Sequence, residues 1–237
     1  MDRKPFRFKQ FAMTDARCGM RINTDGVLLG AWASVVPVSL RRILDVGCGC
    51  GIIALMMAQR APYATVEAID CDPGAISAAA ANFASSPWVE RISLVDNTFE
   101  NYCSSNKFDL VVSNPPFFTE ALKSPEVARA KARHEGELSF EALAARARSM
   151  LTPDGRLAVI LPADADARII AAATMHAIYP RRHCMVRTRP DLPYVRSLWE
   201  FSPEDGKCDE EVLTIRNCSG ELTIEYKSLT HEFHIFL

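Results

Sequence analysis

The sequence lacks long apolar runs, cysteines at zinc-binding spacing and any marked excess of one charge. No apolar run approaches the ~20 residues of a membrane helix, and no apolar stretch follows residues 1–5, so we expect no membrane span and no signal peptide. The 8 cysteines are scattered without the paired spacing of a zinc module. They indicate reduced thiols and a cytoplasmic location.

The overall charge gives no sign of a nucleic-acid partner. The net charge is −2 and the isoelectric point about 6.2, so any RNA contact must come from a local basic patch. Apolar residues make up 49% and charged residues 24% of the chain, as in ordinary globular proteins. The length of 237 residues suits one α/β domain.

Strand and helix patterns alternate along the chain. Residues 6–11 alternate aromatic and polar side chains, which predicts an edge strand. Thr24, Asp25 and Gly26 are expected to cap a helix over 27–32. Further expected strands are 65–70, 91–96, 108–113, 156–161 and 183–188, with late antiparallel strands over 197–202 and 211–215. Further expected helices are 73–83, 140–151, 165–176 and 222–233, and a strand, a glycine loop and a helix lie within 42–58. This alternation predicts an α/β fold with a mostly parallel, seven-stranded sheet and helices on both faces.

Residues suited to ligand binding follow several of these strands. They are the glycine loop 47–51, Asp70, Asp96 and Asn114. Parallel α/β sheets bind ligands at the carboxyl ends of their strands. The sequence therefore predicts one ligand site at that edge of the sheet.

The glycine loop has the pattern Asp-x-Gly-x-Gly-x-Gly, which differs from the Gly-x-Gly-x-x-Gly of dinucleotide sites. Its glycines are Gly47, Gly49 and Gly51. A pyrophosphate would be repelled by the carboxylate of Asp45, whereas an ammonium group would be attracted. S-adenosylmethionine carries an ammonium, a sulfonium and a ribose. Asp70 is placed to accept from both ribose hydroxyls, and either Asp96 or Asn97 could bond the adenine.

A second motif, Ser-Asn-Pro-Pro-Phe-Phe over 113–118, follows a buried strand. Proline fixes φ and holds the residue before it extended. The side-chain oxygen of Asn114 and the carbonyl of Pro115 can therefore both face outward as acceptors, with the ring of Phe117 beside them. This clamp suits a planar group with an –NH2, as in adenine, cytosine, guanine or a glutamine amide.

The two motifs together resemble the class I, Rossmann-like methyltransferases that act on planar amino groups. The segments 6–11, 18–20 and 23–32 extend the resemblance to the bacterial tRNA1(Val) adenine-N6 methyltransferases, as do 86–92, 132–135, 157–162 and 201–203. The similarity covers essentially the whole chain. It implies S-adenosylmethionine as cofactor and adenine 37, 3′ of the anticodon, as substrate. Phe117 stands where many N6-adenine enzymes carry Tyr, and Asp96-Asn97-Thr98 stands where the family has a clearer acid.

We expect the target adenine to leave the anticodon-loop stack, to stack on Phe117, and to donate its amine to Asn114 and Pro115. No metal is required. We expect a monomer with a single domain over 1–237, in which residues 1–40 cover substrate and cofactor. Thr24 and Asp25 are further candidates for cofactor binding. Candidates for RNA binding are Arg7, Lys9, Phe118, Arg129, Lys131 and Arg133, and Arg181, Arg182, Arg187 and Arg189 form another basic cluster.

Other acceptors and classes are also considered. Guanine N2 in ribosomal RNA and the glutamine amide of release factors would fit the same clamp. Release-factor enzymes carry an extra helical domain before the glycine loop, for which only about forty residues are available here. The glycine spacing argues against a nucleotide-binding oxidoreductase, and the intact clamp argues against a non-catalytic binding module.

Overall fold

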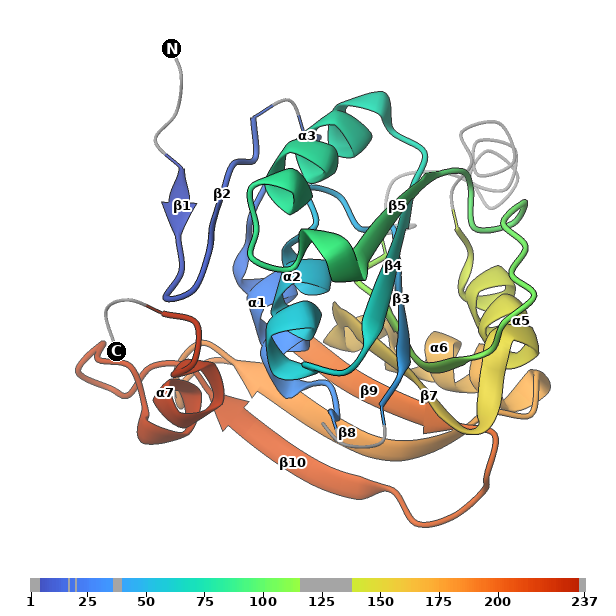
Figure 1. The fold of residues 1–237 in the computed structure, drawn as a ribbon. Coiled ribbons are helices and arrows are strands. Elements are labelled where there is room, and N and C mark those ends of the chain that lie inside the picture. Colours follow the sequence, from blue (N-terminus) through green and yellow to red (C-terminus); the bar gives the residue numbers. More distant parts are fainter. Residues whose placement is uncertain (1–4, 17, 20, 36–39, 116–137, 235–237) are drawn as a thin grey trace, which may run out of the picture.

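The computed structural model describes residues 5–16, 18–19, 21–35, 40–115 and 138–234, and an eight-stranded sheet is its centre (Figure 1). The strand order is β10-β8-β9-β7-β6-β3-β4-β5. The strands are β3 (Arg42–Val46), β4 (Thr65–Asp70), β5 (Ile92–Asp96), β6 (Phe108–Ser113), β7 (Leu151–Pro162), β8 (Tyr179–Arg187), β9 (Arg196–Ser202) and β10 (Asp209–Thr214). The Rossmann-like α/β class is thus confirmed, with eight strands in the sheet rather than seven.

Among the strands that the structure describes in this sheet, only β9 runs antiparallel to the others. It pairs antiparallel with both β7 and β8, whereas β10 pairs parallel with β8. The prediction that 211–215 forms an antiparallel strand was therefore wrong. The segment 203–208 passes the first residues of β8, so β10 adds to the outer side of β8 instead of pairing with β9.

Helices cover both faces of the sheet and form two hydrophobic clusters (Figure 1). The first cluster contains residues of α1 (Thr24–Trp32), α2 (Ile52–Arg60) and α3 (Pro73–Ala84). The second contains residues of α5 (Phe140–Met150) and α6 (Asp166–Met175) on the opposite face. The last helix, α7 (Ile224–Thr230), is shorter than predicted. In the described part of the chain, no helix has the length and apolar character needed to span a membrane.

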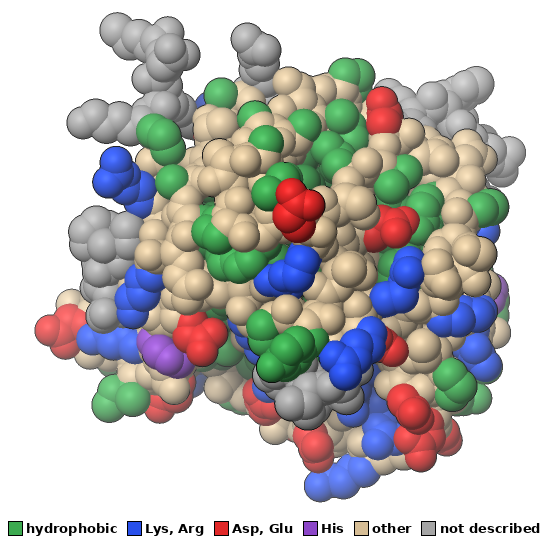
Figure 2. Space-filling model, viewed as in Figure 1, with side chains coloured by type: hydrophobic (Ala, Val, Ile, Leu, Met, Phe, Trp, Pro, Cys, Tyr) green, Lys and Arg blue, Asp and Glu red, His purple; other side chains and the backbone are tan. Residues whose placement is uncertain are grey.

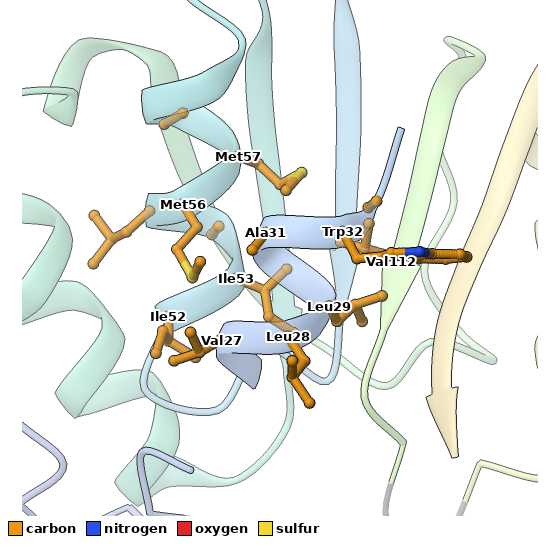
Figure 3. Packing of buried hydrophobic residues seen from close by; sticks show 14 of the residues in the cluster. Val27, Leu28, Leu29, Ala31, Trp32, Ile52, Ile53, Met56, Met57 and Val112 are labelled. Carbon is orange, nitrogen blue, oxygen red and sulfur yellow. The ribbon is translucent and has the colours of Figure 1, made fainter. Parts of the chain in front are cut away.

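Helix α1 packs closely against α2 (Figure 3). A Cβ atom at Gly30 would lie 2.6 Å from Sδ of Met56, so only glycine allows this approach. The N-cap of α1 is Asn23, whose side chain accepts from the N–H of Gly26 at 3.0 Å, rather than the predicted Thr24-Asp25-Gly26. The N-cap lies one residue earlier because the amide oxygen of Asn23 reaches this free N–H.

Two arginines bind the carbonyls that the ends of these helices leave free. Arg60 donates to the carbonyls of Gly30 and Ala33 at the end of α1, at 2.9 and 2.8 Å. Arg91 donates to carbonyls just beyond α2, among them that of Ala64 at 2.8 Å. Cations at helix C-termini are favourable because the last carbonyls lack partners there. These contacts fix the helices that support the glycine loop.

The N-terminal segment is a hairpin, not the single strand predicted over 6–11. Strand β1 (Phe6–Arg7) pairs antiparallel with β2 (Ala12–Met13), and the N–H of Phe8 donates to the carbonyl of Phe11 at 2.8 Å. Phe8 and Phe11 are both buried, with ring centroids 4.5 Å apart. In one strand, residues three apart would point to opposite faces, so burying both requires a turn.

Candidate functional site

A cavity of about 280 Å³ opens at the carboxyl edge of the sheet, near the ends of β3, β4 and β6. Its described lining contains the carboxylates of Asp70, Asp72 and Glu100 and no lysine or arginine. The other described lining residues are Cys18, Gly19, Val46, Gly47, Gly49, Ile69, Cys71, Ala75, Asn97, Thr98, Phe99, Ser113, Asn114, Pro115 and Leu138. Carboxylates near a binding surface favour a cationic ligand and disfavour a pyrophosphate.

The three loop glycines have different surroundings. All have positive φ, at +68° for Gly47, +56° for Gly49 and +86° for Gly51. Gly47 and Gly49 line the cavity, and a Cβ at Gly47 would meet nothing within 4 Å. Gly51 is not among the lining residues. It faces α3 instead, since a Cβ there would lie 2.3 Å from Cε1 of Phe83. Gly47 and Gly49 therefore leave room for a ligand, whereas Gly51 leaves room for α3.

Asp70 connects the end of β4 to the glycine loop. One of its oxygens accepts from the N–H of Gly49 at 2.8 Å, and the other accepts from Cys71 at 2.8 Å and from Asp72 at 2.9 Å. A carboxylate has about four acceptor positions, so capacity remains for a ligand hydroxyl. The sequence indicated the ligand contact but gave no signal for the bond to Gly49.

Asp45 lies behind the loop and is not among the cavity-lining residues. Its side chain is fully buried, and one oxygen accepts from the N–H of Ala54 in α2 at 2.9 Å. The other oxygen has no hydrogen-bond partner among the described residues. Burial raises the pKa of Asp45 to about 7, against the bond from Ala54, which lowers it, while Asp70 raises it further. Asp45 therefore connects β3 to α2 from behind the glycine loop, and its carboxyl is not part of the cavity lining.

At the end of β5, the sequence left two candidates for contact with the adenine, Asp96 and Asn97. Asn97 lines the cavity, whereas Asp96 is exposed and is not among the lining residues. The N–H of Asn97 donates to the carbonyl of Asp70 at 3.0 Å, which holds this turn beside the end of β4. The buried ring of Phe99 adds an apolar wall.

Asn82, which the sequence analysis missed, holds the N-terminal segment beside the glycine loop. Its amide bonds the backbone of Thr14 in both directions at 2.9 Å and donates to the carbonyl of Cys50 at 2.8 Å. Cys18 and Gly19 then line the cavity. The available signal in the sequence was an asparagine within the alanine-rich stretch 73–84; the structure buries it, and buried amides require partners.

Asn114 and Pro115 line the same cavity as the glycine loop. Asn114 is only 7% exposed, and the preceding Ser113 donates its hydroxyl to the carbonyl of Val46 on β3 at 2.9 Å. This bond holds the end of β6 against the end of β3. The predicted Phe117, Phe118, Arg129, Lys131 and Arg133 lie outside the described residues.

Four other predicted residues lie away from the cavity lining. Asp25 pairs with Arg196 at 2.8 Å, and the neighbouring Thr24 is exposed. Lys9 donates its ammonium to the carbonyl of His231 after α7, and Arg7 is exposed on β1. Lys9 thus joins the N-terminal hairpin to the C-terminal helix.

Comparison with known proteins agrees with this geometry. Residues 31–179 match the "Methyltransferase small domain" family. A tRNA1(Val) (adenine(37)-N6)-methyltransferase of Phocaeicola vulgatus is 42% identical over 97% of both chains. The enzyme of the same name from Yersinia enterocolitica is 37% identical over 97% of this chain and 92% of its own.

Solved structures support the fold. A predicted O-methyltransferase from Agrobacterium tumefaciens has a TM-score of 0.67 at 19% identity, covering 88% of this chain and 96% of that one. A putative RNA methyltransferase from Pyrococcus horikoshii has a TM-score of 0.53 at 14% identity, covering 73% and 80%. The chain therefore belongs to the tRNA1(Val) (adenine(37)-N6)-methyltransferase family of methyltransferases.

Proposed function

We propose that this protein transfers a methyl group from S-adenosylmethionine to the exocyclic N6 of adenine 37 in tRNA1(Val). The observation that carries the proposal is one cavity lined by both the glycine loop and the Asn114–Pro115 clamp. The family's name gives the acceptor. We further propose that the protein acts as a cytoplasmic monomer, with residues 1–40 covering its ligands.

The described lining of the cavity fits S-adenosylmethionine. Its carboxylates and its lack of lysine and arginine suit a ligand that carries an ammonium and a sulfonium. Asp70 keeps acceptor capacity for ribose hydroxyls after binding three N–H groups. Asn97 and Phe99 offer a polar group and an apolar wall for the adenine. When bound, the cofactor supplies a methyl carbon activated by its sulfonium.

The clamp would position the target amine. The side-chain oxygen of Asn114 and the carbonyl of Pro115 accept its two hydrogens, which directs the nitrogen lone pair toward the methyl carbon. By the resemblance, Phe117 stacks on the flipped base. The chain contributes mainly orientation, which can account for a large part of a two-substrate barrier.

The test is methyl transfer from labelled S-adenosylmethionine to tRNA1(Val), compared with the same tRNA carrying guanine at position 37. We expect label on the first tRNA only, at N6 of adenine 37. Equal label on both would contradict the proposal and indicate another site. No label on either, with cofactor still bound, would indicate a ribosomal RNA or release-factor acceptor.

A further inference from the structure

The hairpin loop between β8 and β9 lies on the same edge of the sheet as the clamp. Ser113 pairs with Val159 of β7, and three residues further along β7 Pro162 pairs with Arg196, the first residue of β9. With strands about 4.8 Å apart and a rise of about 3.3 Å per residue, Arg196 lies roughly 14 Å from Ser113. With the target base held in the clamp, nucleotides a few positions away along the RNA would reach this loop, residues 188–195.

Backbone hydrogen bonds on three sides fix the loop. The N–H of Val195 donates to Val186 at 2.9 Å and closes it. The N–H of Ala163, after β7, donates to Val195 at 3.3 Å, and the N–H of Arg216, after β10, donates to Thr188 at 2.9 Å. The loop thus presents its side chains from a defined position.

Those side chains combine a stacked guanidinium with exposed apolar groups. Arg187 lies over the ring of Tyr194, with Cζ 5.3 Å from the centroid, and donates to Thr214 and to the carbonyl of Pro190 at 3.0 and 2.9 Å. No carboxylate of the described residues forms an ion pair with Arg187, whereas Arg189 and Arg196 pair with Asp191 and Asp25. Leu192 and Val195 are 39% and 42% exposed.

Charges of both signs lie close together on the surface near β8 (Figure 2). Figure 2 shows Lys and Arg side chains interspersed with Asp and Glu over the lower half of one face, where Figure 1 places β8, β10 and α7. The other arginines of the basic cluster, Arg181 and Arg182, lie at the opposite end of β8. There Arg182 pairs with Glu211 and covers the ring of Trp32.

We propose that loop 188–195, together with Arg187, binds unpaired nucleotides of the anticodon loop that flank the target adenine. The inference rests on the proposed function, which it extends from the base to its neighbours. Single-stranded RNA loops are recognised by stacking on aromatic rings and guanidinium planes, with phosphate contacts from arginine. Arg187 supplies the cation, Tyr194 the ring, and Leu192 and Val195 an apolar surface.

The test compares the affinities of Arg187→Gln, Tyr194→Ala and the wild type for an anticodon stem-loop RNA over a series of salt concentrations. Tyr194→Ala should weaken binding roughly tenfold, since it removes a stacking face. Arg187→Gln should weaken binding severalfold and reduce the salt slope by about 0.7, the value for one single-strand phosphate contact. Arg181→Gln, with the same charge change at the other edge, should bind as the wild type does. Calorimetry with S-adenosylmethionine should give the same cofactor affinity for all variants, which shows that they are folded.

The possible outcomes separate the two proposals. If both loop variants bound the RNA as tightly as the wild type, loop 188–195 would not be the RNA-binding surface, whether or not methyl is transferred. If the loop variants bound RNA more weakly but adenine 37 were not methylated, the RNA-binding role of loop 188–195 would be supported and the proposed function contradicted. A wild type that does not bind this RNA would overturn both.

Discussion

The two halves of the carboxyl edge are built differently. On the β3–β4–β5 half, backbone N–H groups, glycines and carboxylates surround a cavity, and Asp70 alone accepts three N–H groups there. On the β7–β9–β8–β10 half, an exposed loop presents arginine, tyrosine and aliphatic side chains. Asn114 follows β6, where the two halves meet. A small cationic ligand suits the enclosed acidic half, and a larger polyanion suits the open half.

The largest expected effect is at this meeting point. Asn114→Ala removes an acceptor that would hold the amine, so methyl transfer should fall by about 10²–10³-fold, by analogy with the loss of one preorganised hydrogen-bonding group in other enzymes. The affinity for S-adenosylmethionine should change little. Single-turnover rates and calorimetry measure the two quantities. Asn106→Ala, at an exposed position, is the control, and an equal loss of cofactor binding in Asn114→Ala would argue against the clamp.

The next effect distinguishes two glycines of the same loop. Alanine at Gly51 must adopt a left-handed φ, at about 1–2 kcal/mol, and must also displace Phe83, at about 1–3 kcal/mol. We expect Gly51→Ala to lose roughly 3 kcal/mol of unfolding free energy. Gly47→Ala should lose only about 1 kcal/mol but should weaken cofactor binding, because its methyl enters the cavity. Urea unfolding and calorimetry test the pair, and equal losses of stability would remove the distinction.

A further effect concerns Asp45 and depends on pH. Its pKa rises from 3.8 to about 7 in the folded protein, so between these values the native state holds a proton that the unfolded chain releases. The contribution of Asp45 to stability therefore falls as pH rises toward 7. Asn at this position stays neutral and can still accept from Ala54. As the pH rises from 5 to 8, the unfolding free energy of Asp45→Asn should increase by roughly 2–3 kcal/mol relative to that of the wild type. A difference between the two proteins that does not change with pH would contradict this.

The sequence predicted the acidic half better than the open half. Glycine spacing and the acids at strand ends are local signals, and they placed Gly47, Gly49 and Asp70 at the cavity. Pairing between distant segments has no such signal. The partner of β10, the hydrogen bond from the N–H of Gly49 to Asp70 and the contact of Asn82 with Thr14 all depend on the three-dimensional arrangement.

Two charged candidates have partners within the fold. Lys9 and Asp25 were natural candidates for ligands, yet their partners are the carbonyl of His231 and the guanidinium of Arg196. A charged side chain near a predicted site is as readily used to join two elements of the fold. Arg182 and Arg187 both lie on β8, at opposite ends of the strand, yet Arg182 pairs with Glu211 whereas Arg187 has no carboxylate partner among the described residues.

The most direct test of this division is to measure cofactor affinity and RNA affinity for both Asp70→Asn and Tyr194→Ala. We expect Asp70→Asn to weaken S-adenosylmethionine binding at least tenfold and to leave RNA affinity within twofold of the wild type. Tyr194→Ala should do the reverse. If each variant weakened both ligands equally, or if Tyr194→Ala affected only the cofactor, the assignment of the two halves would be wrong.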